Sequence, residues 1–170
     1  AGKFKDGETV TAGTDNYFTL YMSSKTKIDA SSKTWEDGYK SEQRVNFGGK
    51  ADLENMKNLM AFKTEGTAKV KIWWVEAGDD NREVVIYNTS GQEVAKTDAK
   101  AAKNAAVCSE LELTEAGTYY LGGDISNNYF FRVKVVDTVG GSDTPVVRKD
   151  WADVAAPCLL YTSPSPRDRQ

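Results

Sequence analysis

The sequence predicts an all-β domain, an antiparallel β-sandwich of jelly-roll type with about eight or nine strands. Short apolar alternations recur through residues 1–138, and clusters of Gly, Asn, Asp and Ser separate them at roughly ten-residue spacing. No stretch there shows helical periodicity over three turns. The net charge is −3, from 22 basic and 25 acidic side chains, which argues against a protein that coats nucleic acid or an anionic membrane.

The clearest unit is residues 68–94, which reads as two or three antiparallel strands joined by polar turns. Side chains alternate between the two faces of a strand, so one set on its first strand is expected in the core: Val70, Ile72 and Trp74. The other set is then expected to face water: Lys69, Lys71 and Trp73. Trp74 therefore belongs to the core, and Trp73 to the surface.

The same rule predicts strands at residues 17–22, 44–47, 59–64, 109–113, 118–121 and 129–136. In the last of these, four apolar side chains are expected to point inward: Tyr129, Phe131, Val133 and Val135. Arg132 and Lys134 then point outward.

The domain is expected to cover residues 1–138, because composition changes sharply near residue 140. All four prolines lie at position 145 or later, and the ending LLYTSPSPRDRQ lacks strand or helix periodicity. This ending resembles the translated read-through of a sequencing adapter in assembled environmental DNA. Residues 139–170 are therefore predicted to be a disordered tail.

The chain has no His and two Cys, Cys108 and Cys158. Ser-His-Asp and Cys-His catalysis and His-ligated metal sites are thus excluded. A glycosidase needs two carboxylates across a cleft, and no such pair stands out. The chain also lacks a run of about 18 apolar residues that could span a membrane. We therefore expect a protein that is not an enzyme.

Three segments carry a family resemblance: RVNFGGK, LMAFKTEGTAKVKIWWVEAGDDNREVVIYNTSGQEVA and LELTEAGTYYLGGDISNNYFFRVKV. Together they resemble the β-sandwich carbohydrate-binding modules that are appended to bacterial pectate lyases and related plant-cell-wall enzymes. The resemblance covers roughly residues 1–138. It implies a secreted, non-catalytic, monomeric module that binds polysaccharide beside a linked catalytic domain in a fibre-degrading bacterium.

Pectin-binding members of this group hold galacturonan mainly through lysines on one face. Where a typical relative reads leucine-lysine-leucine, this chain reads Val45-Asn46-Phe47, with Arg44 on the same face as Asn46. The ligand stays open between galacturonan and a β-glycan.

Sugar binding to a sandwich face combines aromatic rings with hydrogen-bond donors. Trp73 is the first candidate, with Lys71 beside it, unless another segment covers the ring. Arg44 and Asn46 form a second pair, either for carboxylate recognition or as part of a surface salt bridge. Arg132 extends the basic strip if its strand is a neighbour.

Trp35 and Tyr39 lie in the polar segment KTWEDGYK, as a second stacking platform or as a cap on the core. The turn GDDNR offers Asp79 and Asp80 to a structural calcium ion, although Asp and Asn are also ordinary turn formers. No other cofactor is expected. The competing function is a structural or adhesion sandwich that packs on a neighbouring domain without binding glycan.

Overall fold

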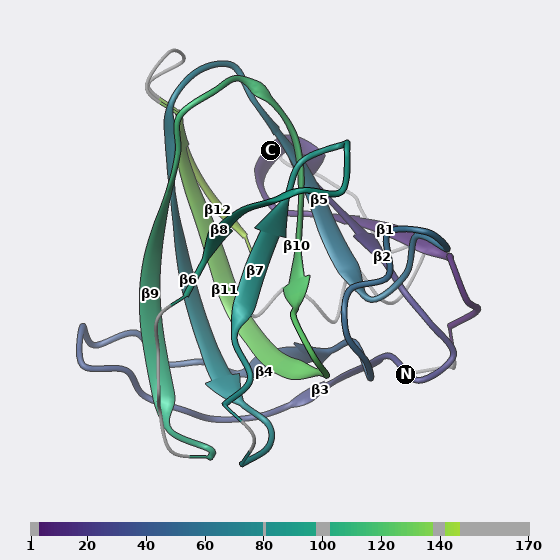
Figure 1. Ribbon diagram of the computed structural model, residues 1–170. Coiled ribbons are helices and arrows are strands. Elements are labelled where there is room, and N and C mark those ends of the chain that lie inside the picture. The colour runs from purple at the N-terminus through teal and green to yellow at the C-terminus, as the bar shows by residue number, and fades with distance from the viewer. Residues whose placement is uncertain (1–3, 80, 98–102, 138–141, 147–170) are drawn as a thin grey trace, which may run out of the picture.

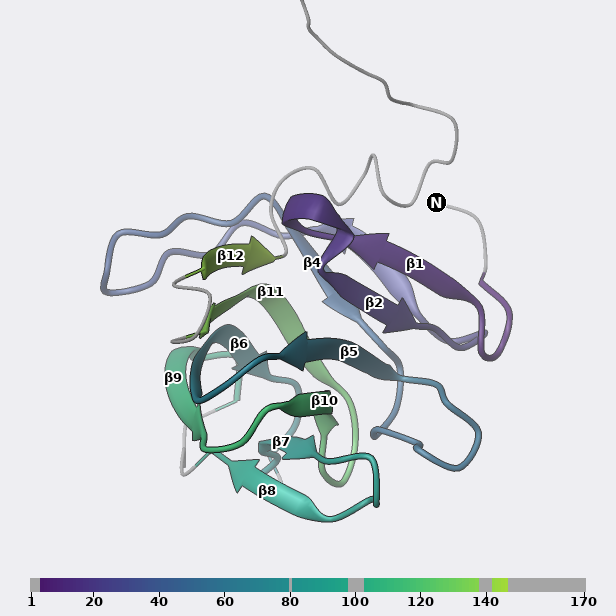
Figure 2. The same cartoon turned by 90° about the horizontal axis from the view of Figure 1, so that it is seen from above.

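The computed structural model describes residues 4–79, 81–97, 103–137 and 142–146 of the 170-residue chain. These residues form two antiparallel β-sheets that lie face to face, as Figure 2 shows. The helical structure among them is one 3-10 turn, η1 (Thr14–Asn16), and none of it has the length or apolar character to cross a membrane. The expected antiparallel β-sandwich is confirmed.

Each sheet contains six of the strands in the described part of the chain. The first sheet holds, in spatial order, β1 (Thr9–Ala12), β2 (Phe18–Tyr21), β5 (Leu59–Thr64), β10 (Gly117–Gly123), β7 (Val84–Tyr87) and β8 (Glu93–Lys96). The second sheet holds β3 (Lys27–Ala30), β4 (Gln43–Asn46), β11 (Asn128–Asp137), β6 (Ala68–Glu76) and β9 (Ala106–Leu113), with β12 (Ser142–Val146) also paired to β11. The strands outnumber the expected eight or nine because short ones such as β1 and β3 show too little alternation to be recognised.

The chain crosses repeatedly between the sheets. From β4 to β7, and again from β8 to β11, each strand lies in the opposite sheet from the strand before it. This is the jelly-roll type of connectivity that the strand pattern of the sequence predicts. β12 lies beyond residue 138, and the remainder of residues 139–170 lies outside the described residues.

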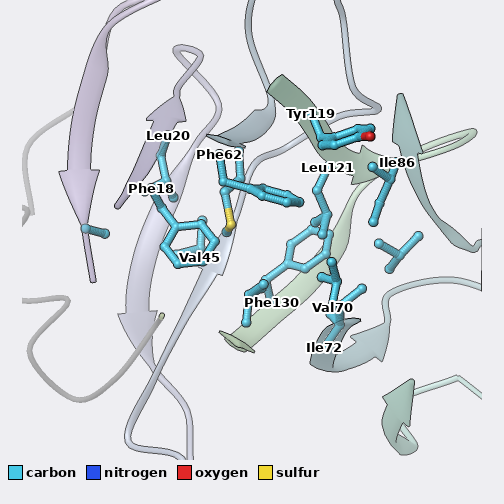
Figure 3. Packing of buried hydrophobic residues seen from close by; sticks show 14 of the residues in the cluster. Phe18, Leu20, Val45, Phe62, Val70, Ile72, Ile86, Tyr119, Leu121 and Phe130 are labelled. Atoms are coloured by element: carbon cyan, nitrogen blue, oxygen red, sulfur yellow. The ribbon is translucent and has the colours of Figure 1, made fainter. Parts of the chain in front are cut away.

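The main core lies between the two sheets. Figure 3 shows the inward-facing side chains of both sheets in contact, among them Phe18, Leu20, Phe62, Leu121, Val45, Val70, Ile72 and Phe130. On β6, Trp74 is fully buried in this core, as the alternation predicts. On β10, Tyr119 is also part of the core.

β11 contains a β-bulge between Phe130 and Arg132, which pair with the consecutive β6 residues Trp74 and Trp73. Phe131 is the extra residue, and it shifts the alternation of side chains by one. Phe130 therefore points into the main core, and Phe131 points to the opposite face of the sheet.

The bulge makes part of the expectation for this strand wrong. Tyr129 and Phe131, expected in the core, belong to a second cluster on the outer face of the second sheet. Val133 and Val135 follow the bulge and point into the main core as expected. A bulge leaves no mark in the pattern of apolar residues, so the sequence could not reveal it.

Candidate functional site

The outer face of the second sheet brings together most of the candidate residues. β11 lies between β4 and β6, so Arg132 of β11 is the register partner of Trp73 on β6, while Arg44 on β4 contacts the β11 residue Tyr129. Lys134 of β11 is the register partner of Lys71 on β6. The sequence left open whether these strands were neighbours, and the topology settles this.

A hairpin in the connection between β3 and β4 covers part of this face. In Figure 1 the connection runs past β6 to β9 before it returns to β4. Its tip forms because the Asp37 carboxylate accepts a hydrogen bond from the Tyr39 backbone N–H, while Gly38 takes a positive φ of 92° that suits glycine. Two backbone hydrogen bonds then close the turn between Trp35 and Tyr39.

Trp73 lies beneath this hairpin and is 2% exposed. The expected strand phase is right, because Trp73 and Trp74 occupy opposite faces of the sheet. The expectation of an exposed Trp73 is wrong, because Tyr39 packs against its ring at a centroid distance of 5.7 Å. The indole Nε1 donates to Asp37 Oδ2 at 2.8 Å, which ties the hairpin to the sheet.

Trp35 and Tyr39 act as the cover rather than as an open platform. Trp35 is 4% exposed, its ring meets Phe131 at 4.9 Å, and its Nε1 donates to the Val107 carbonyl oxygen at 2.8 Å. Tyr39 is half-buried, and its hydroxyl donates to the Phe131 carbonyl oxygen at 3.3 Å. The cap, rather than the open stacking platform, is therefore the arrangement present for Trp35.

Cations lie against these covered rings. The Arg132 guanidinium carbon is 4.5 Å from the centre of the Trp73 ring and 5.3 Å from that of Tyr39. Lys71 Nζ is 4.9 Å from the Trp73 ring and 3.8 Å from an Asp37 carboxylate oxygen. Among the described residues no carboxylate lies within ion-pairing distance of Arg132. Within the described part of the chain, the close contacts of the Arg132 guanidinium are therefore with aromatic rings, and the Asp37 carboxylate acts on it at longer range.

The pKa of Asp37 is lowered from its usual value. The largest cause is the hydrogen bond from the Tyr39 backbone N–H, followed by the desolvation that opposes it and by the hydrogen bond from Trp73. The charges of Lys71 and Arg132 lower it further. Asp37 therefore stays ionised at neutral pH and offsets part of the positive charge of this face.

Arg44 and Asn46 are engaged within the protein. Arg44 Nε donates to Asp29 Oδ1 at 2.8 Å, and its guanidinium lies 4.0 Å from the centre of the Tyr129 ring. The hydrogen bond to Asp29 is the main cause that raises the pKa of Arg44. Asn46 Oδ1 accepts hydrogen bonds from the Gly48 N–H and from Asn127 Nδ2, both at 3.0 Å. Of the two roles expected for Arg44, carboxylate recognition or a surface salt bridge, the structure shows the surface salt bridge.

The GDDNR turn is tied down by its arginine. Arg82 Nη1 donates to the Asn127 carbonyl oxygen at 2.9 Å and to Asn127 Oδ1 at 3.0 Å. The Asp79 side chain is 79% exposed and lies 4.0 Å from Lys103 Nζ, while Asp80 lies outside the described residues. Among the described residues no group of three or more His, Cys, Asp or Glu side chains could hold a metal ion.

Three contributors to this face escape sequence reasoning. Asp37 and Asp29 look like ordinary turn and strand acids, and only tertiary contacts place them beside Trp73 and Arg44. Tyr129 reaches the outer face because of the β11 bulge. The one signal in the sequence for the cover over this face was the aromatic content of KTWEDGYK, which is typical of a loop that packs against another part of the protein.

No protein-family model matches the chain, and no curated protein matches it significantly. Among solved structures, the chain is similar to an arabinose-bound α-L-arabinofuranosidase of glycoside hydrolase family 51 at 14% identity and a TM-score of 0.29. The match covers 85% of this chain and 25% of the arabinofuranosidase chain. At that TM-score the similarity supports no inference about this chain.

Proposed function

We propose that this domain is a non-catalytic module that binds an acidic plant-cell-wall polysaccharide of the pectin or galacturonan class. It would hold a linked secreted enzyme near its substrate, as a monomer outside the cell. The observation that supports this most is the row of cations on the outer face of the second sheet, where Arg132 and Lys134 of β11 lie beside Lys71 of β6. Arg132 matters most, since Asp37 offsets part of the charge of Lys71.

The arrangement favours an acidic ligand over a neutral glycan. Neutral pyranose rings stack on open aromatic faces, and here Trp73 and Trp35 are almost fully buried. An arginine presents a planar fork of donors that matches a carboxylate. The aromatic rings keep the Arg132 fork close to the sheet, so less conformational entropy is lost when it binds a uronate.

The placement of buried carboxylates supports a non-catalytic role. Glu76 and Asp137 are the buried acids among the described residues. Glu76 ends β6, whereas Asp137 pairs with Ala68 at the start of β6. At about 3.3 Å per residue, they lie roughly 26 Å apart along the strand, far beyond the ~5–10 Å that separates glycosidase carboxylates.

The test is affinity electrophoresis of the full chain in gels that contain one soluble polysaccharide each. The panel is homogalacturonan, xylan, glucomannan, xyloglucan and mixed-linkage glucan. We expect retardation by homogalacturonan, weakening as salt is added, because ions screen contacts between exposed charges.

Two outcomes would overturn the proposal. Retardation by a neutral glycan alone, unaffected by salt, would replace cation-based recognition with stacking on a surface other than Trp73. No retardation in any gel, with a cooperative melting transition that shows the protein to be folded, would leave a structural or adhesion module that packs on a neighbouring domain.

A further inference from the structure

A pocket of about 320 Å³ opens between two turns of the sandwich. The hairpin turn between β7 and β8 lines one side, from Asn88 to Ser90, and the turn between β9 and β10, together with the start of β10, lines the other, from Thr114 to Thr118. Val94 of β8 also lines it. This volume lies at the small end of the range for ligand sites, so the pocket suits a small group rather than a long chain.

The pocket is rich in groups that can hydrogen-bond to a ligand. Five hydroxyl side chains line it, and one of them, Tyr119, donates to the Glu115 carbonyl oxygen. The other four make no side-chain hydrogen bond within the described residues: Thr89, Ser90, Thr114 and Thr118. The Asn88 amide is already engaged, because its Oδ1 accepts from the backbone N–H groups of Ser90 and Gln92. That network holds the hairpin turn in shape, so the neighbouring hydroxyls are presented from a fixed backbone.

Charge and apolar surface narrow the class of ligand. Glu112 and Glu115 are the charged residues of the lining, and neither carboxylate forms an ion pair with another described residue. Two unpaired carboxylates repel an anionic sugar, whereas they accept hydrogen bonds from neutral hydroxyl groups. Val94 is 43% exposed and adds an apolar wall against which the C–H face of a sugar ring can pack.

We infer that this pocket binds a neutral sugar residue. The site goes beyond the proposed function and does not depend on it, because it lies on the turns and has the opposite charge preference from the row around Arg132. Glu112 is the register partner of Lys69, and Cys108, four residues earlier on β9, is that of Trp73. At about 3.3 Å per residue the two sites are roughly 13 Å apart along β9, so one polymer with acidic and neutral sugars could occupy both.

The test is an NMR titration of the isotope-labelled full chain with galactotetraose, xylotetraose and cellotetraose, each used separately. With at least one of these probes we expect the amide signals of Ser90 and residues 114–118 to shift, while those of Lys71 and Arg132 stay in place. Trigalacturonate, as the anionic comparison, is expected to leave the pocket signals unchanged.

Two matched variants assign the site. Val94→Glu adds a charge and removes the apolar wall, and it should weaken binding of the neutral probe about tenfold or more. Ile125→Glu makes the same kind of change at another exposed apolar residue, 51% exposed and outside the pocket lining, and should leave binding unchanged.

The inference is wrong if no neutral probe shifts the pocket signals, or if Val94→Glu and Ile125→Glu weaken binding equally. It is also wrong if pentalysine shifts these signals and the neutral sugars do not, because the pocket would then be an acidic site for a basic peptide. Failure here leaves galacturonan retardation by the Arg132 face intact, so the two proposals fail separately.

Discussion

The Arg132 guanidinium carbon lies 4.5 Å from the centre of the Trp73 ring, and the two residues are register partners on β11 and β6. The relationship gives Trp73 a role that differs from sugar stacking. The Trp73 ring packs against the Arg132 cation, and the hairpin that contains Asp37 holds the ring in place through a hydrogen bond to its indole N–H. Under the proposed function, the cation would contact the ligand, and the tryptophan would position the cation.

The first prediction concerns that cation. Arg132→Gln should lower the affinity for homogalacturonan about tenfold, because one charge-assisted contact to a carboxylate is lost. The unfolding free energy should fall by about 1 kcal/mol, the scale of a cation–π contact. Affinity electrophoresis measures the first effect, and urea denaturation measures the second.

Lys63→Gln is the matched control for this variant. Lys63 is exposed on β5 of the other sheet, and the substitution changes the net charge by the same amount. If both variants weaken retardation equally, overall charge rather than the Arg132 face governs binding.

Trp73 should behave as a core residue. Trp73→Ala should cost about 3–5 kcal/mol of unfolding free energy, the usual scale for removing a large buried ring, and Trp74→Ala should cost a similar amount. Trp73→Phe should cost less, since it keeps an aromatic ring and loses the hydrogen bond to Asp37. A Trp73→Ala protein within about 1 kcal/mol of wild type in urea denaturation would contradict the buried position.

The outcome for β6 shows what alternation can predict. Its strand is regular, so the period of two correctly separates Trp74 from Trp73. The same rule fails at Tyr129 and Phe131 on β11, because one bulge residue inverts the faces upstream of it. The rule thus predicts faces only as far as the ladder is regular.

The candidate site required more than local pattern. The alternation of side chains predicts that Trp73 points away from the main core. It does not predict that a hairpin more than thirty residues earlier in the sequence folds over the Trp73 ring. That cover depends on contacts between segments distant in sequence, such as the hydrogen bond from Trp35 to Val107. The face of the sheet on which a side chain lies was therefore predictable in part from the sequence, whereas the exposure of Trp73 was not.

A pH prediction follows from Asp37. The pKa of its carboxyl is lowered in the folded protein, so its ionised form stabilises the fold above the pKa of the unfolded chain, near 4. This contribution is lost as the pH falls through the lowered folded-state pKa. Asp37 is partly exposed, so its contribution should be below about 1 kcal/mol.

Asp37→Asn tests this contribution. The variant should be less stable than wild type at pH 6–7, and the difference should shrink as the pH falls below about 4, where the wild-type carboxyl becomes protonated. Urea denaturation at a series of pH values measures the difference. A gap that stays constant down to pH 2 would show that Asp37 stabilises the hairpin through its shape and not through its charge.

The last prediction concerns the GDDNR turn, where Arg82 bonds twice to Asn127 and packs tightly on Gly78. A Cβ added at Gly78 would come within 2.5 Å of the guanidinium carbon, so the arginine occupies the space over this turn. Arg82→Ala should lower the unfolding free energy by about 1–3 kcal/mol, because both Asn127 oxygens lose a charged donor. Asp79→Asn, at a largely exposed side chain, should change it by less than about 0.5 kcal/mol.

Thermal melts with calcium and with a chelator complete the test. A melting temperature that calcium raises in wild type and not in Asp79→Asn would mean that a bound ion, and not Arg82 alone, holds this turn.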